Sequence, residues 1–144
     1  MMPMPHAERR YVHTENIPIR WGDMDAMGHV NNTVYFRYME QARIGFYDRL
    51  GLSSASPELP PGQGPVVINS FCTYRKALVY PGTVEVKVFV AEPGRSSILT
   101  LYEMRPSYDP DVIYADGYAK GCWIDLEKQK SIELPAALRA LFDR

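Results

Sequence analysis

Cysteine is scarce in this sequence of 144 residues, long apolar runs are missing, and neither sign of charge is in clear excess. The two cysteines, Cys72 and Cys122, fall in segments with the pattern of strands, so we expect free, buried thiols in a reducing, cytoplasmic compartment. The formal net charge is −1 and the basic residues are scattered, which argues against a nucleic-acid partner. The N-terminal MMPMPHAERR has no continuous apolar stretch behind a basic region, so we expect neither a signal peptide nor a membrane span.

The length fits one domain and leaves no room for a separate cofactor domain. No internal repeat or low-complexity tract is visible. We expect residues 1–10 to form a flexible N-terminal segment and residues 11–144 to form a single domain. The segment SSASPELPPGQGP, residues 53–65, is the candidate flexible linker, because it is rich in proline, serine and glycine.

Hydrophobic periodicity predicts one long helix, five strands and a short final helix. Apolar residues recur at helical spacing until Gly51 supplies a stop. The first strand contains Pro18, which cannot donate to a ladder on both sides, so this strand should lie at a sheet edge. The predicted segments are a strand at 11–21, the long helix at 31–52, strands at 66–78, 83–91, 96–105 and 112–126, and the final helix at 135–142.

This order predicts an α+β fold in which the last four strands form an antiparallel meander. The final strand alternates small with larger residues, so one of its faces carries almost no side chain. Its small residues are Ala115, Gly117, Ala119 and Gly121. We favour close approach of the long helix at this face over a glycine-softened strand with bulges, because both glycines lie on the same face.

The stretch RWGDMDAMGHVNN gathers polar residues where the helical pattern begins. A calcium loop would place Asp23, Asp25 and Gly28 at its first, third and sixth positions. Met27 and Val34 stand at two other positions where that loop needs oxygen ligands, so the calcium interpretation fails. A transition metal would have to be wrapped by this loop almost alone, since no other histidine or cysteine cluster is present. We therefore expect no metal.

A second interpretation is a plain connection in which Asn31 or Asn32 caps the helix. Capping leaves two aspartates and a histidine without a role. The catalytic interpretation uses the unbonded N–H groups and partial positive charge of a helix N-terminus, which can hold a carbonyl oxygen as it becomes an oxyanion. A carboxylate just upstream would act as nucleophile or as general base on water. No G-x-S-x-G motif offers a rival hydrolase site.

The run GDMDAMGHVNNTVYFRYMEQAR, followed by YPGTVEVKV, GRSSILTLYEM and GCWIDLEKQKSIELP, resembles the acyl-CoA thioesterases of the 4-hydroxybenzoyl-CoA thioesterase family. The similarity covers nearly the whole chain beyond residue 12. It implies the hotdog fold, in which one long central helix is wrapped by a five-stranded antiparallel sheet in the order β-α-β-β-β-β. It also implies hydrolysis of an acyl-CoA thioester, with CoA favoured over an acyl carrier protein and no cofactor beyond the CoA of the substrate.

Carried over residue by residue, the resemblance implies that Asp25 is the catalytic carboxylate. The backbone N–H of Asn32 is then the main oxyanion donor. The resemblance also implies that Arg95, Ser96 and Ser97 meet the CoA phosphates, which suits a guanidinium and two hydroxyl donors. For Arg95, a solvated charge on a turn is the alternative interpretation.

The neighbouring residues have expected roles in binding or structure. Gly28 turns the loop and is expected among the substrate-binding residues, and His29 either orients the loop or lines the acyl pocket. Tyr35 is expected in the substrate pocket, although its helical spacing also suits plain core. Like charges oppose ionisation and a nucleophilic carboxylate must stay ionised, so we assign Asp23 to structure, accepting loop hydrogen bonds. Glu40 is expected on the helix surface or at an interface.

Two other functions stay open, namely a hotdog protein that binds acyl-CoA without hydrolysis and an enoyl-thioester hydratase. A hydratase pairs an aspartate with a histidine, and His29 follows Asp25 one position too late for that spacing. A second copy of the chain should cover the open sheet edge and the shallow site. The apolar strand at 66–78 is the expected pairing edge, and the resemblance implies a homodimer or homotetramer.

Overall fold

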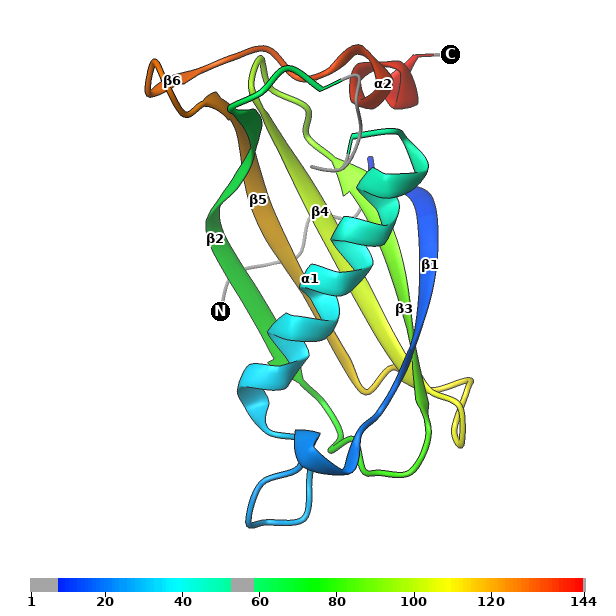
Figure 1. Cartoon of the computed structure of the whole chain (residues 1–144). Coiled ribbons are helices and arrows are strands. Elements are labelled where there is room, and N and C mark those ends of the chain that lie inside the picture. The colour runs from blue at the N-terminus through cyan, green and yellow to red at the C-terminus, as the bar shows by residue number, and fades with distance from the viewer. Residues whose placement is uncertain (1–7, 53–58, 144) are drawn as a thin grey trace.

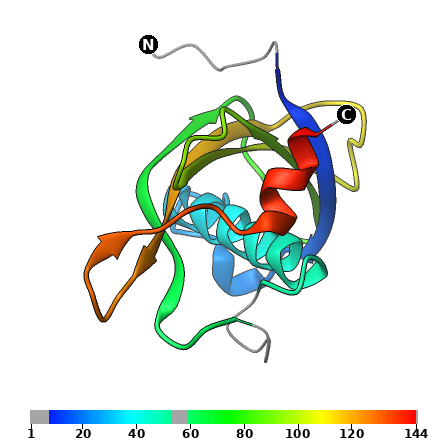
Figure 2. The same cartoon turned by 90° about the horizontal axis from the view of Figure 1, so that it is seen from above.

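The computed structural model describes residues 8–52 and 59–143, and it consists of a long helix lying across a curved antiparallel sheet (Figure 1). The strands are β1 (Arg10–Pro18), β2 (Gln63–Tyr74), β3 (Thr83–Ala91), β4 (Ser97–Pro106), β5 (Ala115–Asp125) and the short β6 (Lys130–Ser131). The helices are α1 (Asn32–Arg49) and α2 (Ala136–Arg139), with the 3-10 turns η1 (Trp21–Asp23) and η2 (Ala140–Phe142). Figure 2 shows the sheet curving around α1, which is the wrapped-helix arrangement that the family resemblance implies.

The predicted helices and strands are confirmed, with ends that differ by a few residues. β3 has the predicted bounds, whereas β1 ends at Pro18 because η1 follows it. Hydrophobic periodicity did not indicate β6, a two-residue strand that pairs with the end of β5. None of the helices in the described ranges is long and apolar enough to cross a membrane.

The two segments expected to be flexible lie partly outside the described residues. Residues 1–7 of the N-terminal segment are outside them, and Arg10 already opens β1. Residues 53–58 of the expected linker are also outside them. The last three residues of that linker belong to β2, which begins at Gln63.

The strand order β1-β3-β4-β5-β2 corrects the predicted four-strand meander. Only β3, β4 and β5 follow one another, and β2 pairs antiparallel with β5 at the far edge. The connection at residues 75–82 carries the chain from β2 to β3 across the end of the molecule where α1 begins (Figure 1). Within it, Leu78 is fully buried, its N–H donates to the Tyr35 hydroxyl, and its carbonyl accepts the Val30 N–H. These contacts with the start of α1 hold the crossing in place, and periodicity could not reveal them.

α1 packs an apolar stripe against the concave face of the sheet. Its buried residues are Tyr35, Tyr38, Met39, Ala42, Phe46 and Tyr47. Opposite it, β3 contributes the alternating and fully buried Val84, Val86, Val88 and Val90. Each such side chain stabilises the fold by about 1.5–3 kcal/mol through burial, so this helix-sheet layer is the main core.

The small-residue face of β5 meets α1, as the sequence predicted. A side-chain carbon added at Gly117 would lie 3.1 Å from the sulfur of Met39. A carbon added at Gly121 would lie 3.9 Å from the Tyr47 hydroxyl. The missing side chain at Gly117 therefore leaves room for the Met39 side chain of α1 and for the Phe71 carbonyl of β2, whereas the contacts at Gly121 are ordinary van der Waals contacts.

The two edges of the sheet differ in character. β1 is one edge and ends at Pro18, as expected for a strand whose proline cannot donate to a neighbour. β2 is the other edge. Its apolar residues Val66, Val67 and Ile68 have exposed fractions of 38%, 46% and 57%. An apolar strand left unpaired in this way favours association with another chain.

Gly45 lies in α1 where β1 places a carboxylate against the helix. A side-chain carbon at Gly45 would collide with Oε1 of Glu15 and lie 3.0 Å from Nε2 of His13. Arg49 donates to Nδ1 of the buried His13 at 3.0 Å, so Nε2 carries the proton and donates to Glu15 at 2.7 Å. The glycine is therefore required by this contact between strand and helix.

We expect Gly45→Ala to lower the free energy of unfolding by about 2 kcal/mol, because the added methyl group displaces Glu15 from its site. Helix propensity alone would give the opposite sign, with alanine better by about 1 kcal/mol. Denaturant unfolding measures the difference. The control is Gly22→Ala, where no atom lies within 4 Å of the added carbon and the change should stay within about 0.5 kcal/mol. A Gly45→Ala protein as stable as the original would contradict the assignment.

Candidate active site

The loop between β1 and α1 is closed by its own backbone. Met24 and Val30 form an isolated antiparallel bridge. Between them, the Asp25 N–H donates to the His29 carbonyl at 2.9 Å, and the Gly28 N–H donates to the Asp25 carbonyl at 3.0 Å. Gly28 has φ of 77°, a left-handed conformation that favours glycine and lets the loop turn at this residue.

The helix that follows begins with an asparagine cap. The side chain of Asn31 accepts the Thr33 N–H at 2.9 Å, which decides between the two asparagines offered by the sequence. Asn32 is the first residue of α1, so the helix itself cannot bond its N–H. That N–H stands at the positive end of the helix dipole, which favours a negatively charged oxygen.

A cavity of about 350 Å³ lies where this loop, the start of α1 and the end of β2 meet. Of the predicted site residues, it brings together Asp25, His29, Asn32 and Tyr35. Its full lining is Asp25, Met27, His29, Val30, Asn32, Tyr35, Tyr74, Arg75, Lys76 and Ala77. Asp25, which carries a carboxylate, and Asn32, the first residue of the helix, thus line one open cavity. A carboxylate beside a helix N-terminus is the arrangement needed to attack a carbonyl and hold its oxygen.

The hydroxyl groups in this cavity are held in neutral, hydrogen-bonded states. The Tyr74 hydroxyl donates to the Asn32 carbonyl at 2.9 Å, and burial raises the pKa of Tyr74 to about 12. Burial also raises the pKa of Tyr35, whose hydroxyl accepts the Leu78 N–H. The neighbouring Cys72 is a free thiol whose pKa burial raises to about 12, so it is not a thiolate nucleophile at neutral pH.

Two cations at the rim of the cavity were missed by the sequence analysis. Arg75 makes two hydrogen bonds with the carboxylate of Asp116, at 3.1 and 3.2 Å. Lys76 lies 3.9 Å from a carboxylate oxygen of Asp109 and 5.1 Å from the centre of the Tyr114 ring. Both follow β2 directly, and only the crossing connection brings them beside the loop that carries Asp25. No local spacing could have indicated this.

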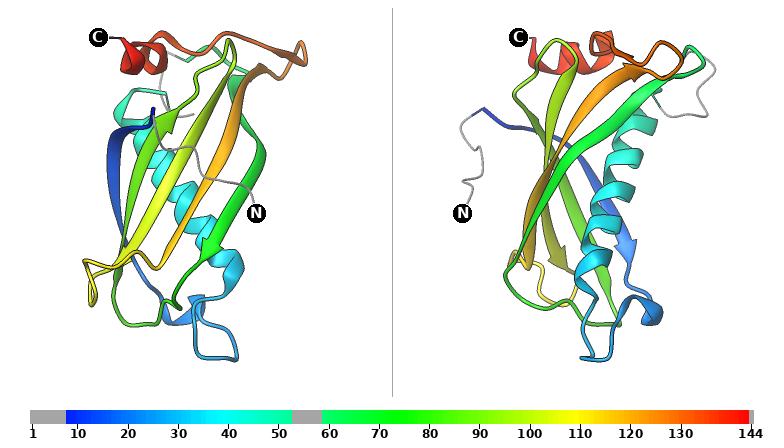
Figure 3. Two further views of the ribbon diagram at one scale, coloured as in Figure 1. Left: turned by 180° about the vertical axis from the view of Figure 1, so that it is seen from behind. Right: turned by 90° about the vertical axis from the view of Figure 1, so that its left-hand side faces the viewer.

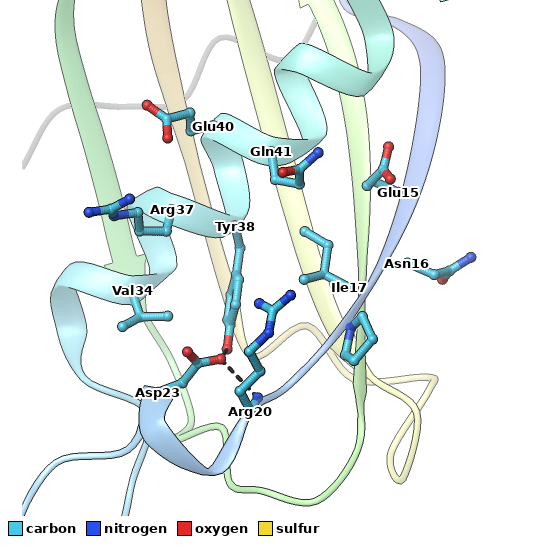
Figure 4. A pocket seen from close by; sticks show the side chains of 11 residues that line it. Glu15, Asn16, Ile17, Arg20, Asp23, Val34, Arg37, Tyr38, Glu40 and Gln41 are labelled. Carbon is cyan, nitrogen blue, oxygen red and sulfur yellow. Dashed lines mark hydrogen bonds between the residues drawn. The ribbon is translucent and has the colours of Figure 1, made fainter. Parts of the chain in front are cut away.

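A larger hollow of about 520 Å³ lies on the other side of α1, between the helix and β1 (Figure 4). Asp23 lines this hollow, whereas Asp25 does not. The carboxylate of Asp23 accepts the Tyr38 hydroxyl at 2.7 Å and the Arg20 backbone N–H at 2.9 Å, which confirms the expected loop hydrogen bonds. Burial, followed by the contact with Asp23, raises the pKa of Tyr38, so its hydroxyl stays a donor. Glu40 is an exposed residue of α1 in the same hollow, in line with its expected place on the helix surface.

Three predicted binding residues lie far from Asp25 within the chain. Arg95, Ser96 and Ser97 follow the turn after β3, at the end of the molecule opposite the Asp25 loop (Figure 3). The Arg95 guanidinium donates to the Ser131 hydroxyl at 2.8 Å and to the Ser131 carbonyl at 3.2 Å. Within a single copy of the chain, these three residues therefore do not reach the cavity that Asp25 lines.

Metal ligands are not gathered in the part of the chain that the structure describes. Across residues 8–52 and 59–143, no group of three histidine, cysteine, aspartate or glutamate side chains is placed to hold an ion.

The chain belongs to the thioesterase-like superfamily, whose family model matches residues 19–142. Among solved structures, it is similar to the PA2801 protein of Pseudomonas aeruginosa, a proposed thioesterase, at 38% identity and a TM-score of 0.86, covering 92% of this chain and 98% of that one. It is also similar to a proposed acyl-CoA thioesterase from Xanthomonas campestris, at 34% identity and a TM-score of 0.70. That match covers 81% of this chain and 95% of the other. A DHNA-CoA thioesterase from Staphylococcus aureus matches at 26% identity and a TM-score of 0.76, covering 85% of this chain and 80% of that one. The predicted hotdog thioesterase fold is thus confirmed.

Proposed function

We propose that this protein hydrolyses an acyl-CoA thioester to a free acid and CoA. The observation that carries the proposal is that Asp25 and Asn32, the first residue of α1, line the same cavity. Membership of the thioesterase-like superfamily supports a thioester substrate, and the name of the Xanthomonas campestris relative supports CoA as its thiol. The free thiols of Cys72 and Cys122 support a reducing compartment such as the cytoplasm.

In the proposed reaction, the thioester oxygen accepts the Asn32 N–H as it becomes an oxyanion. Asp25 acts in one of two ways. As a nucleophile it forms an acyl-carboxylate anhydride and releases the CoA thiolate, after which water cleaves the anhydride. As a general base it takes a proton from water while the hydroxide adds to the carbonyl carbon, and the collapsing intermediate expels CoA. CoA enters as part of the substrate, and no other cofactor is needed.

We expect Asp25→Asn to lower kcat by at least about 1,000-fold, because the amide keeps the shape of the side chain but neither attacks nor takes a proton. Release of free thiol from a panel of acyl-CoAs measures the rate, and retained CoA binding shows that the site is intact. Asp23→Asn is the matched control and should cost stability with only a modest loss of rate. Near-normal turnover by Asp25→Asn would contradict the mechanism.

The same assay separates the alternative functions. A protein that only binds acyl-CoA would release no thiol from any thioester. An enoyl-thioester hydratase using Asp25 and His29 would add water to an enoyl-CoA and leave its thioester bond intact. Either result with the unmodified protein would replace hydrolysis as the function.

The proposal includes a homodimer, alone or as half of a homotetramer, formed through β2. The exposed Val66, Val67 and Ile68 support it, because an unpaired apolar edge is covered when two copies pair. Pairing of β2 with its symmetry mate must be antiparallel if a two-fold axis relates the copies. Each copy would then extend the other's sheet.

We expect the protein to have the mass of a dimer or tetramer by light scattering at micromolar concentration. Ile68→Lys, at the most exposed of the three apolar edge residues, should shift it to monomers, because a buried ammonium group at the pairing edge is costly. Thr14→Lys on the opposite edge strand β1 is the control and should leave the mass unchanged. A monomeric unmodified protein would contradict this part of the proposal.

The dimer would also explain where Arg95 acts. β2 runs from the end of the molecule that holds Arg95 to the end that holds Asp25, since Val66 and Ser97 both pair with Cys122 while Tyr74 lines the cavity. Antiparallel pairing of two such strands brings the Arg95 end of one copy towards the Asp25 end of the other. The CoA phosphates would then meet Arg95, Ser96 and Ser97 of the partner subunit.

We expect Arg95→Ala to raise KM and leave kcat nearly unchanged, because the phosphates are remote from the reacting carbon and keep their charge throughout. The effect should shrink at high salt, which screens an exposed contact, and vanish for an acyl-pantetheine that lacks the nucleotide. Ser131→Ala is the control, since it removes the hydroxyl partner of Arg95 but keeps the guanidinium. An equal loss of kcat with full and truncated substrates would instead make Arg95 a structural residue.

A further inference from the structure

One amide group joins the start of α1 to the carboxylate of Asp25. Oδ1 of Asn31 accepts the backbone N–H of Thr33 at 2.9 Å and its hydroxyl at 2.7 Å. Nδ2 of the same amide donates to Oδ2 of Asp25 at 3.4 Å. The other carboxylate oxygen, Oδ1, accepts the Met27 N–H at 2.9 Å. Each oxygen of Asp25 therefore has one donor, and one of the two donors is tied to the helix that presents Asn32.

Helix capping alone does not call for asparagine at residue 31. Aspartate and serine cap helices about as well, because each offers an oxygen to the same N–H groups. Only asparagine adds an N–H₂ group that can donate to a neighbouring carboxylate. The contact with Asp25 is thus the feature that distinguishes Asn31 from an ordinary cap.

We propose that Asn31 is a positioning residue that fixes the plane of the Asp25 carboxylate relative to the oxyanion donor at Asn32. This inference rests on the proposed function. Because Asn31 is bonded to the first turn of α1, its Nδ2 moves with the Asn32 N–H, and so does the carboxylate oxygen that it holds. The contact is long at 3.4 Å, as catalytic hydrogen bonds often are before substrate binds.

The other charged groups facing Asp25 do not duplicate this contact. His29 lines the cavity from the same loop, and Arg75 and Lys76 line it from the segment after β2. Arg75 is already paired with Asp116. The tyrosines of the cavity, Tyr35 and Tyr74, remain neutral around pH 7. Among the described residues, Asn31 and Met27 supply the donors to the Asp25 carboxylate.

The test compares two variants that keep the helix cap. Asn31→Ser keeps an acceptor for Thr33 but loses the donor to Asp25, and it should lower kcat about tenfold with KM within about twofold. Asn31→Asp keeps the acceptor and sets a second carboxylate beside the first. Since like charges oppose ionisation, the acid limb of its pH–kcat profile should move to higher pH by about one unit. Thermal unfolding should change little in both.

Thr33→Val is the matched control, because it removes only the hydroxyl that donates to Asn31 and leaves both the cap and the contact with Asp25. Its kcat and pH profile should match those of the unmodified protein. If Asn31→Ser has the kcat of Thr33→Val, or if Asn31→Asp leaves the acid limb in place, the inference is overturned while an inactive Asp25→Asn still supports hydrolysis. Normal turnover by Asp25→Asn would overturn both.

Discussion

The close packing of α1 on the concave face of the sheet is the constraint on which the rest of the structure depends. β5 leaves room for the Met39 side chain of α1 at Gly117, and α1 permits β1 to approach by having Gly45 beside Glu15. With the helix held in this way, its first residue, Asn32, has one possible location, at the end of the sheet where the Asp25 loop and the end of β2 also lie (Figure 1). A shift of the helix would therefore change both the core and the candidate site.

Two aspartates separated by one residue have different environments because the start of α1 lies between two hollows. Asp23 faces β1 and is bonded by Tyr38 and by the backbone of Arg20. Asp25 faces the end of β2 and is bonded by Asn31 and by the backbone of Met27. The first carboxylate serves to join loop and helix. The second faces a cavity that also contains an unbonded helix N–H, which is why the proposed chemistry is assigned to it.

The separation of Asp25 from Arg95 makes symmetry part of the proposed function. The strand between Val66 and Tyr74 spans roughly 26 Å at about 3.3 Å per residue, and the two groups lie at its opposite ends. No side chain bridges such a distance. A two-fold axis beside β2 would place a second, reversed copy of the strand next to the first. This pairing would cover the apolar edge and would bring the Arg95 end of one copy to the Asp25 end of the other.

The sequence by itself determined the local features, because these depend on neighbouring residues. Periodicity located α1 and the strands, and alternation of small residues located the face of β5 that meets the helix. The polar run before α1 located the candidate loop and the helix N-terminus, and the choice of Asp25 within that loop came from the family resemblance. Tertiary structure alone decided the partner of β2, since pairing with β5 depends on a crossing connection held by Leu78. That crossing brings Tyr74, Arg75 and Lys76 to the cavity, about 50 residues after Asp25 in the chain. Contacts between residues so far apart leave no periodic signal, because they arise from the packing of whole elements.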